Sequence, residues 1–442
     1  MLRDTSKTPI YHMDLDRKTA PKVTDFEQLS IPKCRRLTLD NGINLNIIDH
    51  GEFDVNRLTM SWIGGANDVD SFSTLMLASE LTREGSKLYS GTEIAETFDF
   101  NGAWLKSEYH SHHSTMVLHS LNRRLSHVLP TLIESISHPS FPTQEFEINR
   151  EKMAKRKELN LTKVAYLSKQ SNQVLIYGKN HPCAFDESPQ DVRNICINDV
   201  KSLHSAIFNA NNCELFLAGR ITPQIEDLIN NFFCQLETTA QHLIHRTVPL
   251  NPEKPQTDFI DVPNSMQSAI TMSIPTISRN HSDYIDLRYT IMALGGYFGS
   301  RLMTNIREDK GYTYGISAAL LGNWEGGVAT ISTQCDNSYT FAVINEIKKE
   351  IKNLTHDNFD DEELNRLKHY AMTQVAATLD SPFSIMDYYE NMRHVLTPSD
   401  YFEEMQHSIQ SLTSKKIAQL ASKYLNVNEL RISIARNPNI SE

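Results

Sequence analysis

The chain is 442 residues long, which exceeds what one hydrophobic core usually organises, so two or three domains are expected. Hydrophobic residues make up 40% and charged residues 22% of the sequence, a balance typical of globular rather than disordered proteins. There are 43 lysines and arginines against 54 aspartates and glutamates, a net charge of -11, and no basic block. This charge argues against nucleic acid or an anionic membrane as a partner.

No apolar run reaches the roughly 18 residues needed to cross a bilayer, and the first residues lack the apolar core of a signal peptide. Residues 1–33 are therefore expected to be an N-terminal extension of a cytoplasmic protein. Scattered cysteines without a C-x-x-C pair are typical of reduced thiols and argue against a zinc ribbon or a disulfide framework. The six cysteines are Cys34, Cys183, Cys196, Cys213, Cys234 and Cys335.

Residues 34–236 are expected to form a first domain of mixed strands and helices. The dipeptide Asn41-Gly42 predicts a hairpin turn within residues 34–48, and the next strand is expected at residues 58–63. Helical spacing predicts a helix over residues 71–83, and Ser90 with Glu93 forms the capping box of the following helix. Alternation predicts one long strand over residues 103–121. Further helices are expected at 125–137, 143–163 and 197–208, and a strand at 214–218.

Residues 237–257 indicate an interdomain linker, because they lack a periodic pattern and contain Pro249, Pro252 and Pro255. The same order of signals then recurs over residues 258–442, the expected second domain. Residues 411–435 mirror residues 196–219, each with a capped helix, an Asn-containing turn and an apolar strand. The sequence therefore predicts an α+β fold of two homologous domains from an internal duplication, each a mostly antiparallel sheet packed with helices. The elements expected in the second domain are strands at 268–274 and 327–333 and helices at 284–294, 339–353 and 361–378.

Residues 294–317 contain a glycine-broken loop, a short amphipathic helix and, after Gly311, an aromatic and β-branched strand. This order places Arg307 and Tyr314 at one helix-to-strand corner. A guanidinium and a phenol directed into one cavity could hold a peptide carbonyl and stabilise a developing oxyanion. The simpler alternative is an arginine that satisfies the last carbonyls of its helix and a tyrosine that packs in a strand.

His110, His112, His113 and His119 fall in the predicted strand, where His110 and His112 would share one face. Two imidazoles could share a metal ion, but Glu108 is the one carboxylate close to them in sequence and no cysteine is near. A solvated strand face is therefore the favoured interpretation.

Met76, Ser79 and Glu80 lie on one face of the helix predicted over residues 71–83. Because zinc prefers histidine, cysteine and carboxylate ligands, this set predicts packing rather than a metal site. The sequence contains no G-x-S-x-G, Walker or Rossmann motif, so a serine-hydrolase elbow and nucleotide binding have no support.

Three stretches give the chain a family resemblance: DNGINLNII (40–48), REGSKLYSGTEIAETFDFNGA (83–103) and LGGYFGSRLMTNIREDKGYTYG (294–315). Over residues 34–440 the chain resembles the pitrilysin and insulinase type of zinc metallopeptidase, which includes the mitochondrial processing peptidase. The resemblance implies two α+β domains that curve around a peptide chamber. It also implies peptide substrates that bind by adding a strand to a sheet edge.

In that family the zinc motif H-x-x-E-H lies on a helix just before the turn that corresponds to residues 83–86. Aligned on this turn, the motif falls on residues 76–80, where Met76 and Glu80 replace both histidines and Ser79 replaces the general-base glutamate. The third ligand of the family, a glutamate, would fall near Glu158. We therefore expect the chain to bind no zinc and to carry no cofactor of its own.

Arg307 and Tyr314 match an Arg and a Tyr of the family's second domain, at the same spacing of seven. In the bipartite members one subunit carries the zinc motif and the other carries this pair. The resemblance thus implies a heterodimer in which this chain supplies Arg307 and Tyr314 in trans, as a substrate and oxyanion clamp, to a homologous zinc-bearing chain. Two alternatives remain: a scaffold subunit with no part in proteolysis, and a self-sufficient metallopeptidase that uses Glu80, Glu158 and the histidines of residues 110–119.

Overall fold

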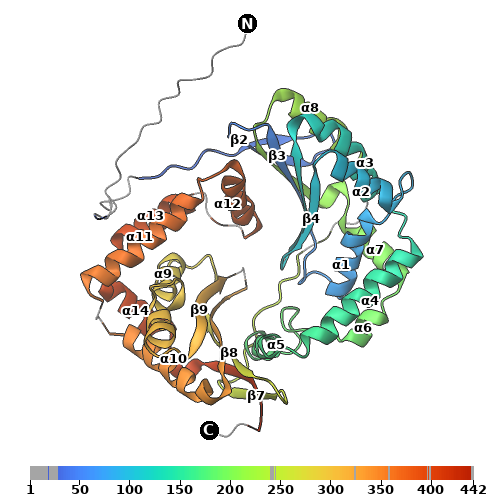
Figure 1. The fold of residues 1–442 in the computed structure, drawn as a ribbon. Coiled ribbons are helices and arrows are strands. Elements are labelled where there is room, and N and C mark those ends of the chain that lie inside the picture. Colours follow the sequence, from blue (N-terminus) through green and yellow to red (C-terminus); the bar gives the residue numbers. More distant parts are fainter. Residues whose placement is uncertain are drawn as a thin grey trace.

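The computed structural model of the chain describes residues 18, 28–238, 243, 245–322, 325–356, 359–395, 397 and 400–439. Most of the expected N-terminal extension, and residues 239–242 and 244 of the expected linker, lie outside these ranges. The described chain folds into two halves, each a mixed sheet packed with helices (Figure 1). The expected α+β fold class is confirmed.

The first half contains a six-stranded sheet in the order β1-β2-β6-β3-β5-β4. Strands β2 and β6 are parallel, and all other neighbours are antiparallel. Its strands are β1 Arg35–Thr38, β2 Asn44–Asp49, β3 Val55–Ile63, β4 Trp104–Tyr109, β5 His113–Leu121 and β6 Cys213–Gly219. Its helices are α1 Phe72–Glu80, α2 Gly91–Phe100, α3 Leu125–Ser137, α4 Thr143–Asn160, α5 Val164–Tyr177, α6 Pro189–Arg193, α7 Ile197–Ile207 and α8 Pro223–Phe233.

The second half repeats this topology with a five-stranded sheet in the order β7-β11-β8-β10-β9, in which β7 and β11 are the parallel pair. This order matches that of the first sheet without its edge strand β1. Its strands are β7 Thr257–Asp261, β8 Gln267–Thr276, β9 Thr313–Gly322, β10 Gly327–Asp336 and β11 Arg431–Arg436. Its helices are α9 Tyr284–Gly295, the π-helix η4 Met303–Asp309, α10 Thr340–Leu354, α11 Asp361–Ala377, α12 Pro382–His394, α13 Tyr401–Ser411 and α14 Ser414–Tyr424.

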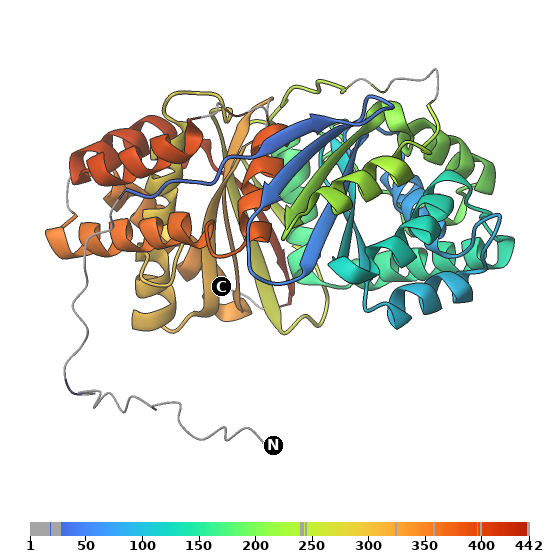
Figure 2. The ribbon, with the colours of Figure 1, turned by 90° about the horizontal axis from the view of Figure 1, so that it is seen from above.

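Local signals account for many of these elements. Gly42, with φ of 90°, makes the turn between β1 and β2, and the predicted capping box of Ser90 and Glu93 begins α2. Each sheet packs its own hydrophobic core against the helices of its half. Figure 2 shows that most helices lie at the two ends of the molecule, with the strands between them.

Two helices pack on the sheet of the opposite half of the molecule: α5 packs on β8 and β11 of the second sheet, and α12 packs on β2 and β6 of the first (Figure 1). On α5 the buried Asn172 donates both amide hydrogens, to Thr271 O at 3.1 Å and to Arg431 O at 3.0 Å. It also accepts a hydrogen bond from Ser273. Each half therefore completes the packing of the other.

Helix α12 buries Ile385 and Met386 in a small third core with Phe216 of the first sheet. A buried arginine of β3, Arg57, pairs with two carboxylates of the same helix. Apolar packing and buried charge thus both hold α12 on the first sheet.

The prediction of one long strand over residues 103–121 is wrong. These residues form a hairpin of β4 and β5, with residues 110–112 in its turn. The turn lacks glycine and proline, and its backbone is instead bound by the segment after β3. Ala66 N–H donates to His110 O at 2.8 Å, and Asn67 N–H donates to Ser111 O at 2.7 Å. A tertiary contact that no local pattern shows therefore produces the turn.

Candidate functional site

The corner that carries Arg307 and Tyr314 is built from η4 and the start of β9. Helix η4 is a π-helix, with Lys310 N–H donating to Asn305 O at 3.1 Å, instead of the α-helix expected from the sequence. Its predicted apolar face is present, because Ile306 is buried in the second core. The chain then reverses at Gly311, with φ of 64°, and enters β9.

Neither side chain of this corner is buried in the core. Tyr314 is 93% exposed. The guanidinium of Arg307 lies 4.6 Å from the ring centre of Phe298, a cation–π contact, and no carboxylate of the described residues lies within ion-pair distance of it. Both groups therefore remain open to an external ligand.

Tyr314 also lines a cavity of about 430 Å³ between α5 and the second sheet. Lys169 of α5 lies on one side of this cavity, and polar residues of the strands, including Thr313, Ser332 and Gln334, lie on the other. Strand β9 is the edge strand of its sheet. An edge strand beside a cavity with both polar and apolar lining residues is suited to an extended peptide that adds a strand.

The positions of the family's zinc motif lie on α1, whose first turn is capped by Ser71. Ser79 is 1% exposed, and its hydroxyl donates to Ser107 Oγ of β4 at 3.0 Å. Tyr109 OH donates to Met76 O at 3.4 Å, and burial raises the pKa of Tyr109 to about 12. This face therefore consists of hydroxyl groups and a methionine packed against β4, a poor set of ligands for zinc.

Glu158 is the residue expected near the position of the third ligand, but its carboxylate forms an ion pair with a residue of another helix. Its Oε1 lies 2.7 Å from Arg193 Nη2 of α6, and Arg193 also binds Glu151. Within the described ranges, neither Glu80 nor Glu158 belongs to a group of three or more metal-ligating side chains.

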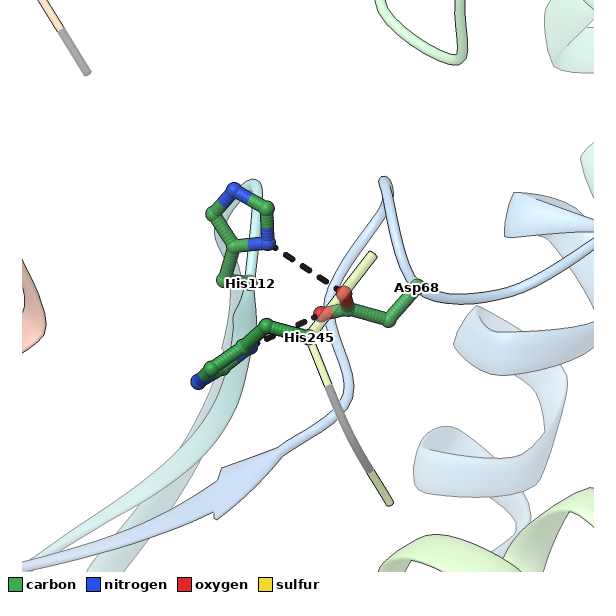
Figure 3. A group of neighbouring side chains, drawn as sticks. All are labelled: Asp68, His112 and His245. Atoms are coloured by element: carbon green, nitrogen blue, oxygen red, sulfur yellow. Dashed lines mark hydrogen bonds and ion pairs between the residues drawn. The ribbon is translucent and has the colours of Figure 1, made fainter. Parts of the chain in front are cut away.

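The structure does bring one such group together: Asp68, His112 and His245 (Figure 3). His112 Nδ1 lies 3.2 Å from Asp68 Oδ1, and His245 Nδ1 lies 3.5 Å from Asp68 Oδ2. On its other side, His112 Nε2 lies 3.0 Å from Oε1 of Glu325, which follows β9. The group joins the first half, the segment between the halves and the second half.

Burial alone would lower the pKa of His112, but the hydrogen bonds with Asp68 and Glu325 outweigh it and raise the pKa to about 9. Burial also disfavours the charged carboxylate of Asp68, yet its hydrogen bonds with both histidines and two backbone N–H groups hold its pKa well below the usual range. The sequence signalled only His112. Asp68 and His245 lie 44 and 133 positions from it, and neither belongs to a local motif.

Comparisons with known proteins identify relatives of the whole chain. The family model for the peptidase M16 inactive domain matches residues 194–370. The chain is 18% identical over 377 residues to the non-peptidase homolog YmxG of Helicobacter pylori, covering 85% of this chain and 87% of the relative. It is 19% identical over 401 residues to the uncharacterized zinc protease YmxG of Bacillus subtilis, covering 88% and 94%. One relative is named a non-peptidase and the other a zinc protease, so these names do not decide the activity.

A solved structure gives the same fold. The crystal structure of a peptidase M16 inactive domain from Pseudomonas fluorescens matches with a TM-score of 0.83 at 20% identity, covering 93% of this chain and 99% of that one. None of the described helices is long and apolar enough to cross a membrane.

Proposed function

The chain belongs to the M16 (pitrilysin) peptidase family, and from this premise we propose that it is the non-zinc subunit of a two-chain metalloendopeptidase. In this proposal a homologous chain brings the zinc ion and the general base. This chain brings Arg307 and Tyr314 in trans, and the substrate is an extended peptide.

The observation that carries the proposal is the contrast between two surfaces of one chain. The face of α1 that would hold zinc in the family carries Met76, Ser79 and Glu80, and Ser79 is buried in a hydrogen bond with Ser107. The corner of η4 and β9, by contrast, carries a guanidinium with no ion pair to the described residues and a nearly fully exposed phenol. Residues 76–80 thus lack the ligands of the family's zinc motif, while the corner of η4 and β9 carries a pair of groups suited to a substrate.

The chemistry of the pair fits binding and stabilisation of a peptide carbonyl. A guanidinium is charged at every physiological pH, and a phenol is a strong hydrogen-bond donor. Two such donors can hold the carbonyl in the ground state and stabilise the negative charge that develops on its oxygen. The cavity beside Tyr314 and the edge of β9 offer the rest of the peptide polar contacts and backbone pairing.

The test is a reconstituted pair: this chain purified together with a homologue that carries H-x-x-E-H. Peptide cleavage is expected from the pair and from neither chain alone. Tyr314→Phe and Arg307→Ala are each expected to lower kcat by about 10²- to 10³-fold, the usual effect of losing one oxyanion donor.

Matched controls come from similar residues elsewhere in the second half. Tyr339 is 42% exposed and Arg366 pairs with Glu362 on its own helix, so Tyr339→Phe and Arg366→Ala should leave cleavage unchanged. Full cleavage by the Arg307 and Tyr314 variants would refute the clamp and indicate a scaffold subunit. Chelator-sensitive cleavage by this chain alone would refute the proposal that the zinc ion and the general base come from a second chain.

A further inference from the structure

The donor set of Asp68, His112 and His245 comes from three separate segments. Asp68 lies in the loop between β3 and α1, His112 in the β4–β5 turn, and His245 in the segment between the two halves. One nitrogen from each histidine and one carboxylate oxygen lie within 4.8 Å of one another (Figure 3).

Backbone contacts hold the carboxylate of Asp68 in place. Gly65 N–H donates to Oδ2 at 3.1 Å and Arg246 N–H donates to Oδ1 at 2.8 Å. A Cβ on Gly65 would lie 2.4 Å from His110 O and 2.5 Å from His112 N, so only glycine lets the hairpin turn approach this loop so closely. The Asp68 side chain is fully buried, and its position is therefore fixed before any ligand binds.

Glu325 orients the imidazole of His112. Its Oε1 lies 3.0 Å from Nε2, so in a singly protonated His112 whose Nε2–H donates to this carboxylate, the Nδ1 lone pair faces Asp68 and His245. A carboxylate on the far nitrogen of a metal-binding histidine is the usual arrangement of metal sites in proteins. A lone pair that faces a carboxylate oxygen needs a cation between the two atoms, either a second proton on His112 or a metal ion.

The charge and the spacing of the donors suit a metal ion. The side chains of Asp68 and Glu325 are 0% and 1% exposed, so the site holds two buried carboxylates, and Glu325 Oε2 has no hydrogen-bond partner among the described residues. His112 Nδ1 lies 3.2 Å from Asp68 Oδ1, and His245 Nδ1 lies 3.5 Å from Asp68 Oδ2, so the two imidazoles face the two oxygens of one carboxylate. One ligand atom from each of the three residues lies within 4.8 Å of the others, and histidine nitrogens and a carboxylate oxygen are donors that zinc prefers.

We propose that Asp68, His112 and His245 bind one divalent transition-metal ion of the zinc type, with Glu325 as the hydrogen-bond partner of His112. The ion ties the segment between the halves to the first sheet and, through Glu325, to the second half. Three protein ligands leave the fourth position of a tetrahedral ion to water. The proposal differs from the expectation that the chain binds no metal. The site shares no ligand with residues 76–80, so this proposal can be confirmed or refuted independently of the proposed function.

The test is a titration of the untagged full chain, first freed of metal with a chelator, with Zn²⁺ alone, followed by calorimetry and thermal unfolding. One ion per chain and a higher Tm are expected. His245→Ala removes a ligand that is only partly buried, so this variant should fold, lose binding and lose the rise in Tm. Glu325→Ala should weaken binding by about 10- to 100-fold, as for other partners of metal-bound histidines.

Two variants serve as controls. His110 lies in the same turn as His112 but has a half-exposed side chain outside the donor set, and His110→Ala should bind Zn²⁺ normally. Glu80→Gln should also bind Zn²⁺ normally, because Glu80 lies on α1 at a position of the family's zinc motif and outside the donor set of Asp68, His112 and His245. Absence of stoichiometric binding, or binding that His245→Ala leaves unchanged, would overturn the proposal and leave a protonated His112 as the group between the two carboxylates.

Discussion

Arg57 of β3 and Glu390 of α12 are 333 positions apart in the sequence, yet Arg57 Nη2 lies 3.2 Å from Glu390 Oε1. The same guanidinium lies 2.6 Å from Asp387 Oδ1, and its side chain is 8% exposed. One buried arginine of the first sheet thus holds two carboxylates of a helix from the second half.

Replacing this arginine is expected to weaken the attachment of α12. Arg57→Met would leave Glu390 as a buried carboxylate without its partner, which typically costs about 3–5 kcal/mol of unfolding free energy. Burial raises the pKa of Glu390 to about 7 although Arg57 lowers it, so urea unfolding is measured at pH 8, where Glu390 of the unmodified chain is ionised. The control is Arg220→Met, which breaks an exposed ion pair with Asp54 and should cost at most about 1 kcal/mol. Equal effects of the two variants would contradict a special role of Arg57.

The crossed helices α5 and α12 are the part of the fold that the sequence did not predict. The buried face of α5 includes Ser168 and Asn172, polar residues at positions where an amphipathic helix normally carries apolar ones. Their partners are hydroxyl and carbonyl groups of the second sheet, around 100 or more positions away. The hydrophobic periodicity of a helix shows which of its faces is buried. It does not show that the surface on which this face packs belongs to the other half of the chain.

The hairpin at Asn41-Gly42, the capping box at Ser90 and the repeated order of elements were predictable because each depends on neighbours in the sequence. The corner of Arg307 and Tyr314 was recognisable for the same reason. The group of Asp68, His112 and His245 was not, because tertiary contacts alone create the turn that carries His112 and bring the other two residues to it.

Acid is expected to destabilise the protein through His204 of α7, which is 5% exposed and packs between Phe141 and Phe208. Burial lowers the pKa of His204 to about 4. An unfolded histidine has a pKa near 6.5, so below that pH the unfolded state binds a proton that the native state does not, and stability falls as the pH drops from about 6.5 to 4.

The size of this effect follows from about 1.4 kcal/mol per pKa unit. Between pH 7.5 and pH 5 the unfolding free energy should fall by about 2 kcal/mol on account of His204. In His204→Leu this share of the pH dependence should vanish in urea titrations at the two pH values. His127 is exposed, so His127→Leu should keep the full dependence, and a pH dependence of His204→Leu equal to that of the unmodified chain would contradict the assignment.

Restoring the zinc motif on α1 is not expected to give the chain peptidase activity. Met76→His with Glu80→His would supply two imidazoles, but a catalytic zinc site needs a third protein ligand. Glu158 is held by Arg193 of α6, and the buried face of α4 offers Met153 and Ala154 instead of a carboxylate.

The general base meets a second obstacle. Ser79 is 1% exposed, so Ser79→Glu would place a carboxylate in a buried position and should cost several kcal/mol of stability. The double variant at Met76 and Glu80 avoids this cost and is therefore the variant in which to measure zinc. With His245→Ala added to remove the site at Asp68, we expect this double variant to bind zinc only weakly at α1. We expect no cleavage of a fluorogenic peptide by either the double or the triple variant. Chelator-sensitive cleavage by the triple variant alone would show that α1 needs only its lost side chains, and that a second, zinc-bearing chain is not required.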